Sequence, residues 1–570
     1  MADVGAGTAD GSPPGARNPR LRDHPLLVAV TAIGAALEAL LVVSIGPASA
    51  VPLAPQVTAP APFGVFHDLR WLFVYHPSWE LFAVAGVALL AGRAALDVWL
   101  VRAAWPRDVP MPPHREHLRH AARFTALEML VLTPFAVLLF AMAVTSLSWL
   151  FFVAVPVLLM VAILMHQGEV ATDWWRATPT RRSVTTVLMA FTLLTVAGAV
   201  LSAVPRALAP LVAACAGVGV AACRLRGVHA LAGRPPVPRR RPFAVTGLAV
   251  VLLVVVGGTA AGFAVAVAVE SGRSPLPTVP ANATGSPVLV VKGFNSKWEG
   301  VTRRWVRGRH RLRRFSYAGL DDRGRPRPYE RGTTHQSLPA LARSMRRQVE
   351  SFHAATGEPV SIVAESEGAL VAQTYLAATP DAPVDAVVLL SPLLSPGRVF
   401  YPPLGENGWG VVSGTLLGGI AAALGTVGPV DVSADTPLFR SMVDEGPTLG
   451  ALLACPPPGV RSFAVLPLDA GVAAPAPTNI AYAHEVVPAF HGGLLGDATT
   501  ARHVEQVLDA DGVPEASGLW AALGDGVNAL ASGWQAPDLE PGALPEWRDL
   551  PDSDCRAVRA ELRRWVGGRT

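Results

Sequence analysis

Residues 364–368 (AESEG) have the composition of a sharp turn that presents a serine nucleophile. They follow the apolar, β-branched run 359–363 and precede the helix-forming run 369–376. A serine held on a strained turn between a strand and a helix exposes its hydroxyl at the edge of a sheet. The small side chains at positions 364 and 368 let the strand and the helix approach closely. We therefore expect Ser366 to be a nucleophile, for which the rest of the chain supplies the partners.

The segments on both sides of this turn alternate between short apolar runs and helix-forming stretches. Such alternation predicts a doubly wound, parallel α/β sheet. A glycine-containing turn at 292–296 (KGFNS) follows the apolar run 288–291, at the carboxyl end of a strand, where the sites of such sheets form. Strands are expected at 288–291, 312–317, 360–364, 385–390, 461–467 and 479–487, and helices at 337–352 and 369–379.

The first half of the chain has the composition of a membrane region. The 570 residues are 51% hydrophobic and 16% charged, whereas a soluble enzyme carries about 25% charged residues. No basic stripe is interleaved with aromatic residues, which argues against nucleic-acid binding. About seven apolar runs approach the roughly 20 residues that a spanning helix needs. These runs cover 26–46, 80–101, 124–145, 147–166, 184–204, 207–223 and 243–269.

Arginine is concentrated in alternate loops of this region. The N-terminal tail and the loops after the second, fourth and sixth runs are arginine-rich, whereas the other loops contain only Arg70 and Arg206. The positive-inside rule therefore places the N-terminus in the cytoplasm. Seven crossings then place everything after residue 270 outside. In a competing interpretation, residues 48–50 (ASA) are a signal-peptidase site, whose use would leave six helices and the same outward C-terminus.

These patterns divide the chain into five segments. The last-but-one, a globular α/β domain, contains a long Gly-rich, apolar insertion at 395–458. The segments are a disordered cytoplasmic tail (1–24), a multi-pass transmembrane region (25–270), a linker (271–286), the α/β domain (287–535) and a C-terminal extension (536–570).

Four further residues have chemistry that depends on this topology. Cys455 and Cys555 fall in the exported part, where a disulfide can persist, and the sequence leaves their pairing open. Glu38 and Glu128 fall within expected membrane helices, where carboxylates are candidates for function. For Glu128 we favour a structural role, with the carboxylate paired inside the bundle or reaching an interface, and for Glu38 both roles stay open.

Residues 287–535 resemble an α/β-hydrolase of the lipase/esterase kind. The resemblance lies in AESEG at 364–368, KGFNS at 292–296, FSYAGLDDRG at 315–324 and HGGLLGD at 491–497. It implies an α/β-hydrolase fold in which the insertion at 395–458 forms a lid over the site. Two positions depart from the family pattern, with Ala364 where glycine is frequent and Lys292 where many members have histidine.

The resemblance assigns roles to three side chains. Ser366 looks like the nucleophile, His491 like the general base and Asp469 like the acid that orients the base. His491 lies in a glycine-flanked turn before an expected helix at 501–508, and Asp469 ends an expected strand. The chain order serine, acid, histidine is the order of this fold. In such a triad the histidine removes the serine proton and the acid fixes the imidazole tautomer.

Other residues compete for these roles. His484 lies in an expected strand, His503 in an expected helix, and His335 just before a helix, so each has a structural interpretation. Asp497 follows His491 closely, but no strand is expected to end there. We therefore favour His491 and Asp469.

An oxyanion hole would be formed by two backbone N–H groups. One belongs to Glu367, and the other to Phe294 or, as the alternative, Asn295. The side chains of Glu365 and Glu367 are expected to form ion pairs or to face solvent.

The resemblance implies a membrane-anchored, extracytoplasmic serine hydrolase of the cell membrane that cleaves carboxylic esters with acyl or lipid-like groups. Its expected partners are the lipid bilayer and an ester or lipid-like small molecule. No metal-ligand spacing, phosphate loop or dinucleotide fingerprint is found, and the mechanism needs no cofactor. The alternatives are an acyltransferase of the same fold and a non-catalytic, hydrolase-like binding domain coupled to a membrane or transport bundle.

Overall fold

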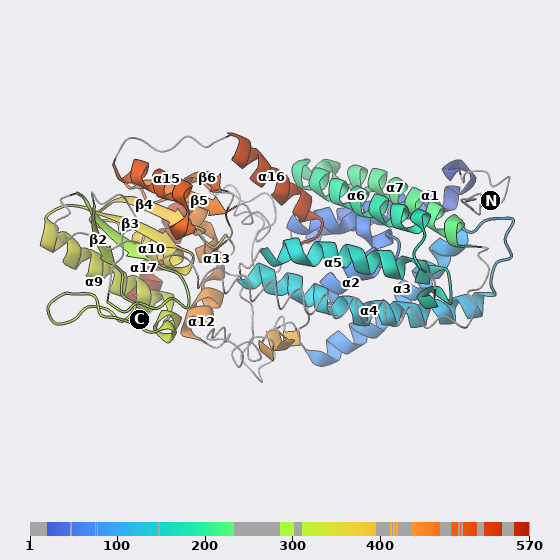
Figure 1. Cartoon of the computed structure of the whole chain (residues 1–570), viewed down its shortest axis with the longest axis horizontal. Coiled ribbons are helices and arrows are strands. Elements are labelled where there is room, and N and C mark those ends of the chain that lie inside the picture. The colour runs from blue at the N-terminus through green and yellow to red at the C-terminus, as the bar shows by residue number, and fades with distance from the viewer. Residues whose placement is uncertain are drawn as a thin grey trace, which may run out of the picture.

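The computed structural model of the chain has a helical N-terminal region and a C-terminal α/β region that lies beyond one end of the helices (Figure 1). The structure describes residues 20–45, 48–73, 76, 78–145, 149–176, 178–232, 285–300, 310–394, 411–412, 414–416, 418–419, 436–467, 480–487, 489, 491, 494–509, 518–537 and 552–568.

The N-terminal region is built mostly from apolar helices. Helix α1 packs along α7, α6 also packs on α7, and the 3-10 segment η2 (Ala48–Thr58) lies against both α1 and α6. Helix α4 packs on α2 and α3. The helices are α1 (Pro25–Ile45), α2 (Phe63–Leu72), α3 (Trp79–Ala103), α4 (His114–Thr145), α5 (Trp149–Met165), α6 (Arg181–Ala203) and α7 (Ala209–Leu231), with the short 3-10 turns η1 (Leu21–Asp23), η3 (His166–Glu169), η4 (Trp174–Arg176) and η5 (Arg206–Leu208).

Four stretches among the described residues are long and apolar enough to cross a membrane. They expose large apolar side chains such as Leu37, 59% exposed, and Val87, 68% exposed. Such exposure suits contact with lipid rather than with water. The chain is therefore a multi-pass membrane protein with four candidate spans. The spans are Pro25–Ser44, Trp79–Ala103, Arg181–Ala203 and Arg206–Leu231.

The structure supports fewer spans than the roughly seven expected. The run 124–145 is the second part of α4, which begins with polar residues, and α5 has 17 residues, fewer than the roughly 20 that cross a bilayer. The expected helix at 243–269 lies outside the described residues. In contrast, α7 extends to Leu231, beyond the expected end at 223.

The α/β region contains a parallel sheet of six strands in the described residues, in the order β2-β1-β3-β4-β5-β6. A strand is present at each of the six expected places, so the predicted parallel α/β sheet is confirmed. β2 and β6 are shorter than expected. The strands are β1 (Pro287–Val291), β2 (Arg311–Arg314), β3 (Val360–Glu365), β4 (Val384–Leu390), β5 (Arg461–Pro467) and β6 (Ala483–Val487).

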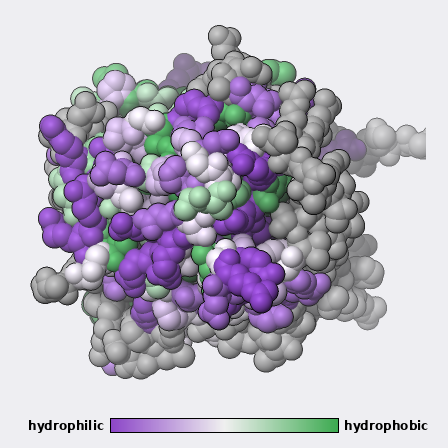
Figure 2. All heavy atoms as spheres, turned by 90° about the vertical axis from the view of Figure 1, so that its left-hand side faces the viewer, coloured by the Kyte–Doolittle hydropathy of each residue, from purple (hydrophilic) through white to green (hydrophobic). Residues whose placement is uncertain are grey.

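Helices cover both faces of this sheet because the central strands are apolar on both sides. Helices α9 (Leu338–Thr356) and α10 (Glu367–Ala378) cover the face of Leu289 and Ile362. Helix α15 (Ala498–Leu508) covers the opposite face, packing on Val363 and Val388 (Figure 1). The surface that this region turns away from the helices is largely hydrophilic (Figure 2).

The end of the chain is tied back to the α/β region. Cys455 and Cys555 form a disulfide with a Cα–Cα distance of 5.5 Å, which settles the pairing that the sequence leaves open. Cys555 belongs to α17 (Asp552–Gly567), which packs on α10 and α9. A disulfide in this region is typical of a domain outside the cytoplasm.

Part of the expected insertion at 395–458 is described. It contains α12 (Pro437–Asp444), α13 (Gly446–Gly450) and the 3-10 turn η8 (Ala451–Ala454), and α12 packs on α9 and on the 3-10 turn η6 (Arg331–His335). Figure 1 shows α12 and α13 between the sheet and the helical region. Residues 395–410 and 420–435 of the expected lid lie outside the described residues, as do the expected tail up to residue 19 and most of the expected linker.

One helix connects the two regions by contact. Helix α16 (Gly518–Ser532) packs on β6 of the sheet and runs along α6 of the helical region (Figure 1). The turn that follows α16 buries Trp534 within the helical region, where its ring stacks on Phe191 at a centroid distance of 4.8 Å.

Candidate functional site

Ser366 lies on a strained turn between β3 and α10. Its φ of 55° and ψ of −121° are unusual for a residue with a side chain, and such strain costs about 1–3 kcal/mol unless the surroundings enforce it. Gly368 allows the turn, because a Cβ atom there would lie 2.8 Å from Cγ1 of Val291 and 2.9 Å from the carbonyl oxygen of Lys292. The small residue at 368 is therefore required by the close approach of α10 to β1.

The loop after β1 passes directly beside Ser366. A Cβ atom on Gly293 would lie 2.8 Å from Cβ and 3.3 Å from Oγ of Ser366. The hydroxyl of Tyr317 donates a hydrogen bond of 2.6 Å to the carbonyl oxygen of Lys292, which holds the start of this loop. The loop and the serine turn thus form one packed unit at the carboxyl ends of β1 and β3.

The structure brings His491 to Ser366. Oγ of Ser366 and Nε2 of His491 are 2.9 Å apart, although 125 positions separate the two residues. Burial lowers the pKa of His491 to about 4, so the imidazole is neutral at pH 7 and its Nε2 can accept the proton of the hydroxyl. The described part of the chain therefore contains a serine–histidine pair with the geometry of a nucleophile and its base.

The competing histidines are engaged elsewhere. His484 interacts through Nδ1 with the carbonyl oxygen of Tyr482 at 3.0 Å, and Nε2 of His503 lies 2.9 Å from Glu485. The ring of His335 stacks on Phe294 at a centroid distance of 4.7 Å. No hydrogen bond joins any of the three to Ser366.

The structure describes only one of the two candidates for the acid that orients His491. Asp469 lies outside the described residues. Asp497 accepts hydrogen bonds from the backbone N–H of Thr500, at 2.7 Å, and from its hydroxyl, at 3.1 Å, and so caps the N-terminus of α15. This capping role accounts for the presence of an acid soon after His491.

Of the oxyanion donors considered, the N–H of Asn295 has a partner already. It donates to Oγ1 of Thr334 at 3.0 Å, and Asn295 has a positive φ of 58°. Phe294 precedes it in the loop beside Ser366, and Glu367 is the first residue of α10. Phe294 and Glu367 therefore remain the candidates for the two donors.

The two glutamates that flank Ser366 are buried, so neither faces solvent, which was one of the two expected alternatives. Glu367 is 2% exposed, and both of its carboxyl oxygens are buried without a hydrogen-bond partner among the described residues. Burial raises the pKa of this carboxyl well above its ordinary value and so favours its neutral form. Oε1 of Glu365 accepts a 3.4 Å hydrogen bond from the backbone N–H of Leu495, in the segment that follows His491.

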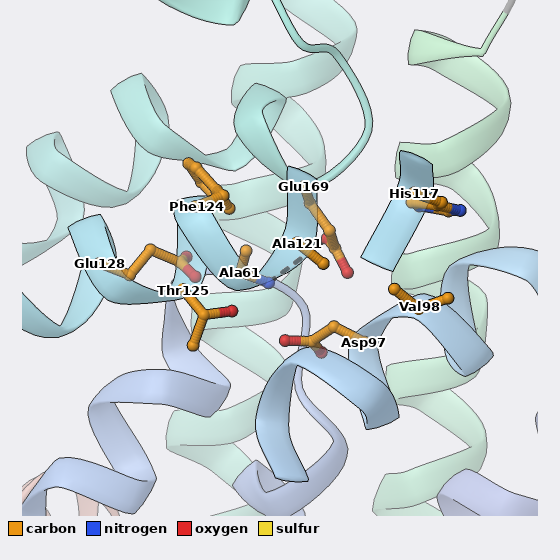
Figure 3. A pocket seen from close by; sticks show the side chains of 9 residues that line it. All are labelled: Ala61, Asp97, Val98, His117, Ala121, Phe124, Thr125, Glu128 and Glu169. Atoms are coloured by element: carbon orange, nitrogen blue, oxygen red, sulfur yellow. Dashed lines mark hydrogen bonds between the residues drawn. The ribbon is translucent and has the colours of Figure 1, made fainter. Parts of the chain in front are cut away.

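A second group of polar side chains lies inside the helical region. A small cavity there is lined by Asp97, Glu128 and Glu169, whose carboxyl groups point toward one another from three different elements (Figure 3). The described part of the chain contains no group of His, Cys, Asp and Glu residues with the geometry of a metal site. The sequence analysis singled out Glu128 but missed Asp97, which lies equally far inside the expected run 80–101 and carries the same signal. Glu169 follows the expected run 147–166 and gives no such signal.

Comparisons of the chain with protein-family models, with curated proteins and with solved structures find no match.

Proposed function

We propose that the α/β region is a serine hydrolase that cleaves carboxylic esters through an acyl-enzyme on Ser366. The observation that carries this proposal is the 2.9 Å contact between Oγ of Ser366 and Nε2 of His491. The positive φ of Ser366 and its place between β3 and α10 support it, because a nucleophile elbow combines the same features.

The reaction follows from this geometry. Nε2 of His491 accepts the hydroxyl proton as Oγ of Ser366 attacks the ester carbonyl carbon, and the N–H groups of Glu367 and Phe294 stabilise the oxyanion. The protonated histidine then donates its proton to the leaving alcohol, and water repeats the sequence to release the acid. Asp469 is proposed as the acid that orients His491. Burial favours the neutral form of the Glu367 carboxyl, which limits negative charge near the oxyanion.

The surroundings favour an ester with an apolar acyl group. Phe294 contacts Phe439 of α12 at a centroid distance of 5.4 Å, so the edge of the site is aromatic. The described part of the insertion lies between the sheet and the membrane helices (Figure 1). An acyl chain that approaches from the membrane side therefore meets an aromatic edge of the site.

We also propose that this region lies outside the cytoplasm. The arginine-rich loops favour a cytoplasmic N-terminus. The four candidate spans together with the helix expected at 243–269 give an odd number of crossings, and counting α4 and α5 as well keeps the number odd. The Cys455–Cys555 disulfide supports the same side.

A fluorophosphonate probe tests the enzyme proposal in membranes that contain the full chain. The wild-type protein should be labelled, and Ser366→Ala and His491→Ala should not. Ser391→Ala is the matched control, because Ser391 also ends a strand with a positive φ, of 45°, and it should keep the label. Labelling that survives Ser366→Ala, or a folded wild-type protein without label, would contradict the proposal.

Topology needs a separate experiment. Protease added outside intact cells should cut within 271–286 and yield the α/β region as a separate band on a denaturing gel. Full protection of that region would place it in the cytoplasm.

A further inference from the structure

Helix α16 carries a stripe of exposed leucines. Leu519 is 69%, Leu523 44% and Leu530 47% exposed. At about 100° per residue these positions fall within about 40° of one another around the helix. Among the described residues between 285 and 509, no large apolar side chain is exposed to that extent. The stripe is therefore unlike the rest of the α/β region, whose outer surface is largely hydrophilic (Figure 2).

The stripe continues an apolar surface of the membrane helices. Helix α16 packs on α6, which is one of the four candidate spans. Helix α6 itself exposes Met189, 46%, and Val196, 49%. A helix that lies beside a membrane span and presents leucines outward has the surface of a lipid-facing helix.

The backbone carbonyl groups that follow α16 accept hydrogen bonds from side chains of the helical region. The carbonyl oxygen of Gly533 accepts a 3.1 Å hydrogen bond from Nη1 of Arg70 and a second one from Nε2 of Gln56, and the carbonyl oxygen of Gln535 accepts a 3.0 Å bond from Arg70. Non-helical backbone occurs at membrane depth only where protein groups bind its polar atoms. A buried cation at the end of a helix also complements the helix dipole.

This turn lies deep along the membrane span. Nε1 of Trp534 donates to Oγ1 of Thr195 at 2.9 Å. Thr195 precedes the last residue of α6, Ala203, by eight positions, which is about 12 Å along the helix axis. Half of the hydrocarbon core of a bilayer is about 15 Å. Gly198 and Gly533 permit the close contact, because a Cβ atom on Gly198 would lie 2.8 Å from Cα of Gly533.

We propose that residues 518–537 form a re-entrant membrane segment. Helix α16 leaves the sheet and enters the bilayer beside α6, so that Leu530, at the C-terminal end of its leucine stripe, faces lipid acyl chains. The turn at 533–535 is held in the bundle near mid-membrane depth. The chain then returns to the α/β region, where α17 is held by the disulfide. The sheet is thus anchored at the membrane from its C-terminal side as well as through the N-terminal helices.

Single cysteines test this placement in the full chain, with Cys215 and Cys223 replaced by serine and the disulfide kept. Leu530→Cys should react in intact membranes with an apolar maleimide and should resist a charged, water-soluble one. Asp322→Cys is the control for a water-exposed site, because the side chain of Asp322 is fully exposed, and it should react with the charged reagent.

Three results of the labelling experiment would overturn the proposal. Reaction of Leu530→Cys with the charged reagent as fast as that of Asp322→Cys would place the stripe in water. Disulfide-linked dimers of Leu530→Cys on oxidation would show that a second copy of the chain covers this part of the stripe. Reaction with neither reagent would mean that protein rather than lipid covers it.

The polar interior of the helical region carries a second, independent inference. Two arginines there are already matched by carboxylates. Nε of Arg93 binds Oδ2 of Asp68 at 2.7 Å, whereas Arg224 contacts Glu169 and binds Oδ1 of Asp97 at 3.3 Å. Three carboxylates therefore share two guanidinium groups before Glu128 is considered.

Glu128 is the additional carboxyl of this group. It is 1% exposed, and its Oε1 is buried with no hydrogen-bond partner among the described residues. Figure 3 shows its carboxyl group directed toward the cavity that Asp97 and Glu169 also face. The expected pairing of Glu128 inside the bundle is thus wrong for Oε1. In contrast, Glu38 is paired, with Oε1 2.6 Å from Nε2 of His67.

We infer that Glu128 is a proton-binding site of the membrane region. An unpaired, buried carboxylate beside two others is costly, so Glu128 holds a proton at neutral pH, and the cavity offers room for about one water molecule to exchange it. The charged and titratable groups that line the cavity or interact electrostatically with Glu128 are Arg93 and Asp97 on α3, His117 on α4, Glu169 on η3 and Arg224 on α7.

A carbodiimide tests this state in the full-length protein. Dicyclohexylcarbodiimide adds the O–H of a protonated carboxyl across its N=C bond, and the adduct rearranges to an N-acylurea with no leaving group. Glu128 should gain the mass of the whole reagent at pH 7, and labelling should fall by roughly tenfold per pH unit once the proton is lost. Glu116→Gln, an exposed control on the same helix, should keep this label, and Glu128→Gln should lose it.

Thermal unfolding gives a second readout that does not depend on access of the reagent. A carboxyl that is neutral only in the folded protein makes stability fall as the pH rises. The melting temperature of the wild type should therefore fall more between pH 6 and pH 9 than that of Glu128→Gln. Label on Asp97 or Glu169 instead of Glu128, or equal pH profiles for the two proteins, would overturn the inference.

Discussion

Removal of the Cys455–Cys555 disulfide should destabilise the α/β region by a measurable amount. The two cysteines are 100 positions apart, and a cross-link that closes a loop of about 100 residues stabilises the folded state by about 4.7 kcal/mol in the chain-entropy treatment. The loop contains β5, β6 and α15, so the unfolded chain gains freedom over a large part of the sheet when the bond is absent.

The magnitude converts to a shift in melting temperature. For a unit of about 250 residues each kcal/mol corresponds to about 2 °C, so Cys455→Ser with Cys555→Ser should lower the melting temperature by about 10 °C. Differential scanning fluorimetry of the full chain in detergent measures it. A reducing agent should reproduce the shift in the wild type and leave the double variant unchanged.

The matched control is the pair of free cysteines. Replacement of Cys215 and Cys223 by serine also makes two cysteine-to-serine changes but breaks no cross-link, and reductant should still lower the melting temperature of that variant. A loss of less than about 2 °C in the disulfide variant, against the roughly 10 °C expected from loop closure, would refute the reasoning. It would mean that the packing of α17 on α10 holds the C-terminus by itself.

Three further predictions concern close contacts and protonation. Gly293→Ala places a methyl group 2.8 Å from Cβ of the serine beside it, so fluorophosphonate labelling should fall by roughly 100-fold, whereas Gly332→Ala, with open space around it, should keep the wild-type rate. Gly198→Ala should separate α16 from α6 at a cost of about 1–3 kcal/mol, seen as a lower melting temperature and faster external proteolysis. Gly92→Ala has no neighbour within 4 Å and serves as its control. Because burial lowers the pKa of His491 to about 4, the base stays neutral above that pH, so the labelling rate should hold as the pH falls past 6 and decline only near about 4. A half-loss near pH 6.5 would show a solvated histidine instead.

Local sequence determined much of the α/β region. The apolar run at 360–365, the small residue at 368 and the helix-forming run after it are neighbours in the chain, so their preference for a strand, a turn and a helix is expressed locally. The same holds for the six strands and for the long apolar helices. The predicted number of membrane spans was too high for the described residues, because length and apolarity alone did not separate α4 and α5 from spanning helices.

Contacts between distant segments were decided by the tertiary structure. The glycine-flanked turn around it favoured His491 over its rivals, but the distance between its ring and Ser366 depends on how β3 and the chain after β6 meet. The burial of Glu367 follows from the packing of α10. The hydrogen bond between Trp534 and Thr195 joins residues that are 339 positions apart in the sequence. A local sequence pattern does not predict such partners, because the burial of each side chain depends on elements elsewhere in the chain. The sequence therefore determined which elements form, and only the tertiary structure decided which polar groups they bury together.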